Sequence, residues 1–273
     1  MSAPNALQAM TRDVDMVRDV AIAAADAAAD VVRAHRDAGT AVEWQQKGRV
    51  DYVSSVDTAA EARIRDVVAR SLPDARVIGE ELTPDETIGS GITFIVDPLD
   101  GTTNFLHRYP EYAVSVAALI EREVMVGVVV NVPYGARYVA VRGRGATLDG
   151  HPTRVSSIQE PARALIGTGL PFKHPEQIAR YIRELPTIMR ATAGVRRAGA
   201  AALDLCAVAA GRFDAFWEHS LEPWDFAAGA LIIREAGGVI TDLRGSQLSF
   251  SRSGVLAGNP WMHAWMLSVL SGA

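Results

Sequence analysis

Apolar side chains recur at helical spacing near the start of the chain. Residues 11–38 carry Val and Ala three or four positions apart, with charged side chains between them. This spacing places the apolar side chains on one face of a helix. The pattern therefore predicts a long amphipathic helix that ends at Gly39. A second helix is predicted over residues 58–72, where Pro73 stops it.

Between residues 76 and 148 the apolar positions form short runs that are typical of strands. Two of the runs are rich in β-branched residues, and the polar sequence Glu121-Arg122-Glu123 between them predicts a hairpin turn. An earlier run ends directly at Asp97, the first residue of an acidic segment. The predicted strands cover residues 76–79, 92–96, 113–120, 124–132, 138–141 and 146–148.

In the second half of the chain, apolar strands alternate with helical patterns. Strands that first follow one another and then alternate with helices favour layered helices and sheets over a doubly wound fold. The length of 273 residues fits one large domain or two closely joined ones. The predicted strands here cover residues 164–168, 213–217 and 238–242, and the predicted helices cover 175–190, 199–210, 224–236 and 260–270.

Charge and composition exclude several classes of protein. The chain has 27 Lys and Arg against 32 Asp and Glu, a formal net charge of −5, and no block of basic residues. This balance argues against nucleic acid or an anionic membrane surface as the main partner. No apolar run approaches the ~18 residues of a membrane span, and residues 1–12 lack the pattern of a signal peptide. The single cysteine, Cys206, allows no intrachain disulfide, so we expect a cytoplasmic protein.

The most informative chemical pattern is the segment Asp97-Pro98-Leu99-Asp100-Gly101-Thr102-Thr103, which follows an apolar strand. Two carboxylates three positions apart across a turn fixed by proline can converge on one point, where they would repel each other strongly. A hard divalent cation would relieve this repulsion, and carboxylates with backbone carbonyls are the ligands that Mg²⁺ prefers. An ordinary strand-to-turn connection is the alternative interpretation, since Asp, Pro and Gly all form turns.

Other acidic positions have ordinary structural explanations of their own. Glu80 and Glu81 follow a short predicted strand, where adjacent acids usually belong to a solvated loop. Asp225 stands at the start of an Ala-rich helix and Asp57 precedes another helix, so capping of the helix explains both of them.

Motifs for other kinds of chemistry are absent from the sequence. The six histidines include no pair at zinc-binding spacing, and neither a G-x-S-x-G elbow nor a P-loop occurs. No G-x-G-x-x-G follows a predicted strand, so a dinucleotide site has weak support. Cys206 lies in an apolar helical pattern and is predicted to be a core residue rather than a nucleophile.

Considered together, four segments resemble the signatures of the inositol monophosphatase family of magnesium-dependent, lithium-sensitive phosphatases. The resemblance implies an α+β fold of the layered αβαβα sandwich type and a homodimer. It also implies a single catalytic domain over residues 1–273, with an N-terminal half of about 1–150 and a C-terminal half of about 151–273. In the family's order the four segments are residues 51–57, 79–81, 97–105, and 224–229 with 235–238.

The resemblance also implies roles for individual residues. Asp57 and Thr102 match the pair that orients a hydroxyl toward a water, and Glu80 would join them in catalysis. Lys47 lies near the position of a basic residue in a metal-site loop. Two to three Mg²⁺ ions would be held by the side chains of Glu80, Asp97, Asp100 and Asp225 and by the carbonyl of Leu99. The implied substrate contacts are Glu80, Leu99, Asp100, Gly101, Thr102, Thr103, Gly199, Ala200, Ala201, Glu218 and Asp225.

The reaction implied is the hydrolysis of a phosphomonoester by a metal-activated water, with a small phosphorylated polyol, myo-inositol 1-phosphate, as the first choice of substrate. Histidinol phosphate, fructose 1,6-bisphosphate and 3′-phosphoadenosine phosphate are alternatives, because relatives use the same metal site for them. Ala200 stands where relatives often carry Ser or Thr, and Ser54-Ser55 replaces a commoner Thr-containing pair, which bears on substrate preference. A non-catalytic regulatory binding role is the alternative from another class, although no basic stripe for RNA is present.

Overall fold

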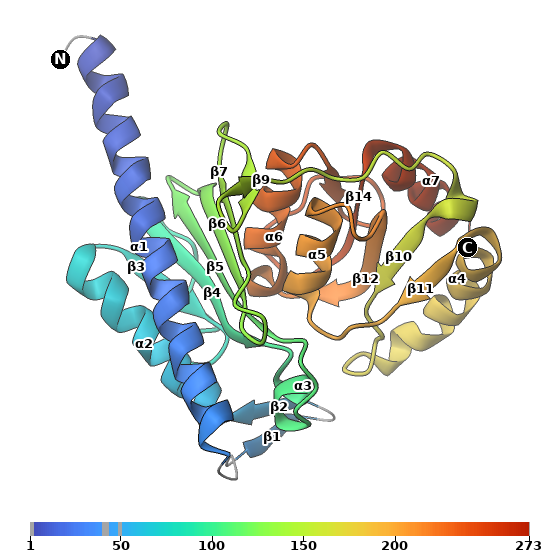
Figure 1. Cartoon of the computed structure of the whole chain (residues 1–273), viewed down its shortest axis with the longest axis horizontal. Coiled ribbons are helices and arrows are strands. Elements are labelled where there is room, and N and C mark those ends of the chain that lie inside the picture. Colours follow the sequence, from blue (N-terminus) through green and yellow to red (C-terminus); the bar gives the residue numbers. More distant parts are fainter. Residues whose placement is uncertain (1–2, 40–43, 49–50, 273) are drawn as a thin grey trace.

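The computed structural model describes residues 3–39, 44–48 and 51–272, with side chains for residues 14–39 and 54–272. Helices and sheets alternate in five layers, with helices on the outside and in the middle (Figure 1). This arrangement confirms the prediction of a layered α+β fold. Within the described ranges, no helix is both long enough and apolar enough to cross a membrane.

The first helical layer covers one face of a seven-stranded sheet. It consists of α1 (Ala3–Ala38) and α2 (Ser55–Ser71), which pack side by side against the sheet (Figure 1). The small side chains of Ala21, Ala24 and Ala28 on α1 are fully buried in this layer, as the helical pattern predicted. In sheet order, the strands are β3 (Arg76–Gly79), β4 (Ile92–Asp100), β5 (Ala113–Ile120), β6 (Glu123–Asn131), β7 (Arg137–Val141), β8 (Ala146–Leu148) and β9 (His151–Pro152).

The middle layer packs against the opposite face of this sheet. It consists of α5 (Ala201–Ala209) and α6 (Pro223–Glu235), which contact strands of both sheets. Gly127 on β6 permits a close approach, because a Cβ there would lie 2.7 Å from the carbonyl oxygen of Ala228 on α6. One apolar core therefore joins both sheets through the middle helices.

The second sheet has five strands and carries the last helical layer on its far face. In sheet order, the strands are β11 (Gly194–Arg196), β10 (Leu165–Thr168), β12 (Ala215–Leu221), β14 (Ser253–Gly258) and β13 (Val239–Thr241). The outer helices are α4 (Ile178–Ala191) and α7 (Pro260–Ser271), and short 3₁₀ turns form at Pro161–Arg163 and Pro175–Gln177. A separate hairpin, β1 (Trp44–Gly48) and β2 (Asp51–Ser54), lies beside the short helix α3 (Thr102–Leu106) (Figure 1).

Several predicted boundaries are wrong, and the reason is tertiary. β4 runs to Asp100 instead of ending at Val96, because its pairing with β5 continues past a bulge. The helix predicted over residues 175–190 begins as a 3₁₀ turn. The sequence pattern predicted none of β1, β2, β9, β11 and β14, which are short or gain their pairing partners from distant parts of the chain.

Candidate active site

The candidate site forms where two parallel strands end. β3 and β4 pair in parallel with Gly79 opposite Val96, so Glu80, which follows the last residue of β3, comes next to Asp97 on β4. The carboxyl ends of parallel strands meet at one edge of a sheet, which brings together acids that are far apart in the sequence. The structure thus connects two of the predicted segments directly.

A bulge shapes the segment that follows Asp97. Asp97 lies opposite Ser115 and Asp100 lies opposite Ala113, so β4 carries one extra residue here. The N–H of Leu99 donates to Oδ1 of Asp97 at 2.9 Å, which fixes that carboxylate over the bulge. The Asp-Pro-Leu-Asp sequence is therefore both a local turn and the end of a strand.

Gly101 closes the bulge in a conformation that glycine alone adopts easily. Its φ is +89°, and a Cβ there would lie 2.9 Å from the carbonyl oxygen of Glu111 and 3.3 Å from the Cβ of Ala200. The turn therefore brings Gly101 against Ala200, which the sequence also placed among the substrate contacts. These two predicted segments meet in the structure.

Asp57 and Thr102 make the contact that the sequence predicted. The hydroxyl of Thr102 lies 2.9 Å from Oδ1 of Asp57 and 3.1 Å from the carbonyl oxygen of Leu99. The other oxygen of Asp57 caps α2, because it accepts the N–H of Ser54 at 3.0 Å. Capping and the site contact therefore coexist, one on each carboxylate oxygen.

Asp225 likewise both caps a helix and lies near the other acids of the candidate site. It stands in the first turn of α6, where its Oδ2 accepts the N–H of Glu222 at 2.7 Å in a capping box. Its negative charge also raises the pKa of Asp97, Asp100 and Glu218, so it lies within electrostatic reach of all three.

Crowded negative charge is the main electrostatic property of the site. Burial raises the pKa of Asp97 well above its usual value, and the charges of Glu80, Asp100 and Asp225 raise it further. Burial and then the charge of Asp225 raise the pKa of Asp100 to about 7, although backbone N–H groups oppose this. One of these groups, the N–H of Ala202, donates to Oδ2 of Asp100 at 2.8 Å. A cation among these carboxylates would remove most of the repulsion.

The donor set fits Mg²⁺ in its chemistry. The carboxylates and the Leu99 carbonyl are hard oxygen donors, which Mg²⁺ selects over softer metals. In the part of the chain that the structure describes, however, no group of three His, Cys, Asp or Glu side chains is arranged so that it could hold a metal ion. The four predicted carboxylates are thus electrostatic neighbours, and their closer convergence on a metal stays a prediction.

Glu218 on β12 faces this cluster from the second sheet. Its carboxylate lies over Gly169, where a Cβ would come within 2.0 Å of its Cδ. Burial, then the charges of Asp225 and Asp100, raise the pKa of Glu218 to about 8, and the cations Arg197 and Lys173 oppose this rise. The structure therefore brings the predicted substrate residue Glu218 to the same site.

The other predicted substrate residues lie in α3 and where α5 begins. Gly199 precedes α5 with a φ of +95°, and Ala200 and Ala201 are buried where the helix begins. Thr103 is exposed in α3. The side chain of Lys47 lies outside the described residues, although its backbone belongs to β1.

Sequence reasoning missed two residues around the site, Lys173 and Glu61. Lys173 was available as a signal, since it is one of only two lysines in the chain. Arg197, which lies over the ring of Phe172 at 5.2 Å, is the second cation near Glu218. Glu61, fully buried on α2, carried a signal that was not used, namely its spacing of four residues from both Asp57 and Arg65 on one helix face.

Comparisons with known proteins give the same family throughout. The model of the inositol monophosphatase family matches residues 13–271. The Nus factor SuhB of Escherichia coli is 40% identical over 250 residues, which cover 92% of this chain and 94% of that protein.

Solved structures have the same fold. The extragenic suppressor protein suhB of Bartonella henselae superposes with a TM-score of 0.87 at 38% identity, covering 93% of this chain and 98% of that one. The inositol monophosphatase of Anabaena superposes with a TM-score of 0.81 at 30% identity, covering 96% and 97% of the two chains. The chain belongs to the inositol monophosphatase family.

Proposed function

We propose that the protein is a Mg²⁺-dependent phosphomonoesterase that converts myo-inositol 1-phosphate to inositol and phosphate. Membership of the inositol monophosphatase family supports a phosphatase. The observation that carries the proposal is the group of Glu80, Asp97, Asp100 and Asp225, whose mutual repulsion at the end of β3 and β4 calls for cations. Phosphate esters bring negative charge that such a site accepts only when cations are bound.

The proposed ligand sets are those that the resemblance to the family implies for these residues. Glu80, Asp97 and the carbonyl of Leu99 would hold one Mg²⁺, and Asp97, Asp100 and Asp225 would hold a second. A third ion would bind more weakly near Glu80. Bound Mg²⁺ lowers the pKa of a water and neutralises charge on the leaving oxygen.

The protein's own groups position the reactants. Asp57 accepts from the Thr102 hydroxyl, which leaves the lone pairs of that oxygen to accept a hydrogen bond from the attacking water and so to orient it. The backbone from Asp100 to Thr103 would cradle the phosphate. Glu218 and residues 199–201 would receive the polyol. Bound Mg²⁺ would compensate the charges of Asp225 and Asp100 that raise the pKa of Glu218, so that its carboxylate would be ionised and accept hydrogen bonds from the hydroxyls of the polyol. Positioning and electrostatics supply most of the acceleration in phosphoryl transfer.

A substrate panel tests this proposal. The purified protein is assayed with myo-inositol 1-phosphate, histidinol phosphate, fructose 1,6-bisphosphate and 3′-phosphoadenosine phosphate at one Mg²⁺ concentration, with and without Li⁺. We expect the highest kcat/KM for inositol 1-phosphate, activity that requires Mg²⁺, and inhibition by Li⁺. Asp225→Asn, assayed in parallel, should be inactive on every ester. Dominant turnover of another ester would replace the substrate, and turnover without Mg²⁺ would overturn the reaction.

Two cations favour the alternative substrates that carry a second phosphate. Arg197 and Lys173 lie within electrostatic reach of Glu218, a proposed substrate residue, and Lys173 also lies within reach of Asp100. A second phosphate would interact favourably with both cations, as in fructose 1,6-bisphosphate. The panel separates the two cases, because Arg197→Gln should lower kcat/KM for a bisphosphate far more than for a monophosphate.

A regulatory binding role is the second candidate function. It is supported by the relatives at 40% identity that are called Nus factor SuhB. Such a role would be separable from hydrolysis, so in a pull-down Asp225→Asn should recover the same partner as the unmodified protein while it loses turnover. We further propose that the protein acts in the cytoplasm and that it is a homodimer. Light scattering of the purified chain would test the dimer.

A further inference from the structure

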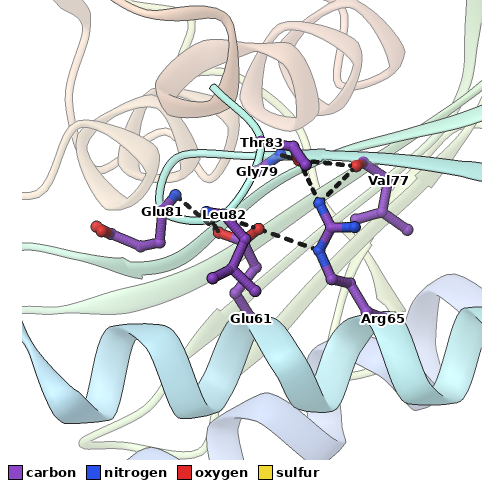
Figure 2. A network of polar contacts seen from close by, with 7 residues as sticks. All are labelled: Glu61, Arg65, Val77, Gly79, Glu81, Leu82 and Thr83. Carbon is purple, nitrogen blue, oxygen red and sulfur yellow. Dashed lines mark hydrogen bonds and ion pairs between the residues drawn. The ribbon is translucent and has the colours of Figure 1, made fainter. Parts of the chain in front are cut away.

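Glu61 is a buried carboxylate that binds the loop carrying Glu80. It lies on α2 with no exposed surface. Its Oε2 accepts the N–H of Glu81 at 2.8 Å, and its Oε1 accepts the N–H of Leu82 at 3.2 Å (Figure 2). The two residues that follow Glu80 are thus bound to a helix in the adjacent layer.

The loop is shaped around this carboxylate. A Cβ on Gly79 would lie 2.2 Å from the Cδ of Glu61, so glycine is required for the carboxylate to enter the turn. Gly79 precedes Glu80 and Glu81 follows it, which means that Glu61 contacts the backbone on both sides of Glu80. The direction in which Glu80 leaves β3 therefore depends on Glu61.

Arg65 and Thr83 complete the network shown in Figure 2. Arg65 donates to Oε1 of Glu61 at 3.3 Å, to the carbonyl oxygen of Val77 at 2.9 Å, and to the hydroxyl of Thr83. Thr83 donates in turn to the carbonyl oxygen of Val77 at 3.0 Å and accepts the N–H of Gly79 at 3.2 Å. Both ends of the loop are thereby fixed to β3.

A buried ion pair is weak evidence for stability, because the cost of removing its charges from water offsets their attraction. The hydrogen bonds of this pair are instead directed at one loop. We propose that Glu61 is a positioning residue that acts through Glu80, and that it holds the Glu80 carboxylate beside Asp97 for Mg²⁺ binding. This inference rests on the proposed role of Glu80 as a Mg²⁺ ligand. Residues that orient a metal ligand typically change metal affinity about 10–100-fold when they are replaced.

Glu61→Gln tests the inference with little change in volume. The amide retains one acceptor oxygen but turns N–H groups toward the donors of Leu82 and Arg65, so the loop should loosen. We expect the Kd for Mg²⁺, measured by calorimetry on the protein with Mg²⁺ alone, to rise about tenfold. The Mg²⁺ concentration for half-maximal activity should rise equally, and kcat at saturating Mg²⁺ should largely recover.

Glu184→Gln is the matched control. Glu184 on α4 is equally buried and is also bound by an arginine four residues away, since Arg180 donates to its Oε1 at 2.8 Å. Its other partner is His219, which contacts Oε2 at 2.6 Å and lies far from the Glu80 loop in sequence. Glu184→Gln should lower Tm as much as Glu61→Gln does and leave the Kd for Mg²⁺ unchanged.

A double-mutant cycle with Glu80→Gln separates the possible outcomes. If Glu61 acts only through Glu80, then Glu61→Gln changes the Kd less than about twofold once Glu80→Gln is present. Unchanged Mg²⁺ affinity in Glu80→Gln would overturn the assigned role of Glu80. If Mg²⁺ affinity falls in Glu80→Gln but not in Glu61→Gln, the positioning role alone would be overturned. The same would follow if the two substitutions raise the Kd for Mg²⁺ independently, so that their fold-changes multiply in full in the double mutant. If Glu61→Gln does not fold, Thr83→Val replaces it in the cycle with a smaller expected effect, about threefold.

Discussion

The two sheets contribute acids to the candidate site in different ways. The seven-stranded sheet contributes acids that crowd one another, as the raised pKa of Asp97 between Glu80 and Asp100 indicates. The five-stranded sheet contributes a single acid, Glu218, whose pKa is raised by burial and by the charges of Asp225 and Asp100, while the cations Arg197 and Lys173 oppose this rise. Crowded acids require bound cations, whereas a single acid near the side chains of Arg197 and Lys173 can serve as an acceptor for hydroxyl groups. The difference suggests that the first sheet carries the chemistry and the second carries substrate recognition.

The largest expected effect tests the first half of this comparison. Asp97→Asn removes the carboxylate that both proposed Mg²⁺ ions share, while its amide oxygen can still accept the N–H of Leu99. We expect kcat to fall at least ~10³-fold at saturating substrate, by the loss of electrostatic stabilisation in the transition state. Steady-state kinetics over a Mg²⁺ titration measures this fall.

The fold should survive the same substitution, because Asn relieves the repulsion from Glu80, Asp100 and Asp225. Circular dichroism of Asp97→Asn should match that of the unmodified protein. If this variant keeps its kcat at saturating Mg²⁺, the crowded acids of the first sheet do not carry the chemistry.

A smaller effect of a different kind is expected in the second sheet. Glu218→Gln keeps the size of the side chain but weakens the acceptor that would face the substrate hydroxyls. We expect KM to rise about tenfold, since a hydrogen bond to a charged group contributes ~1.5–3 kcal/mol, while kcat changes less than about threefold. The comparison of KM and kcat for inositol 1-phosphate measures the split. A fall in kcat as large as that of Asp97→Asn would show that the two sheets do not divide the work.

The difference between the sheets also explains how much of the site the sequence could predict. The segment from Asp97 to Thr103 is continuous, and its turn chemistry is local, so its composition alone suggested a cation site. The contact between Asp57 and Thr102 joins residues 45 positions apart, and only the resemblance to a family predicted it. Local pattern also predicted most helices and the central strands, because burial follows their hydrophobic period.

Features that depend on long-range pairing were not accessible in the same way. The parallel pairing that brings Glu80 beside Asp97 depends on the register of β3 and β4, and no local pattern encodes a register between separate strands. The spacing of Glu61 from Arg65 could indicate an ion pair on one helix, but the other partners of Glu61 are backbone N–H groups 20 and 21 residues away, which no local pattern indicates. β14 was missed because its pairing partners, β12 and β13, are separate segments of the chain.

The smallest expected effect is on stability, where the two sheets should respond to pH in opposite directions. Asp100 belongs to the first sheet, and its pKa is raised from 3.8 to about 7. A raised pKa adds stability below about pH 4 that is lost as pH rises through about 7. His263, on α7 behind the second sheet, has a pKa that burial lowers from 6.5. The stability that neutral His263 contributes to the folded protein is present above about pH 6.5 and is lost as pH falls through the lowered pKa.

Thermal unfolding of the metal-free protein from pH 5 to pH 8 checks both signs. As pH rises, the Tm of Asp100→Asn should increase relative to that of the unmodified protein. The increase should be about 2–4 °C for each kcal/mol of charge burial and repulsion that the substitution removes. His263→Gln should gain instead as pH falls below 6.5, by a smaller amount, because glutamine has no charge to bury and can still bond Thr241, which lies 2.9 Å from Nε2 of His263. Saturating Mg²⁺ should abolish the first gain and leave the second unchanged, since only Asp100 belongs to the proposed metal site. Equal responses of both variants to Mg²⁺ would mean that the charge of Asp100 is not compensated by metal, and the contrast between the two sheets would then be one of burial alone.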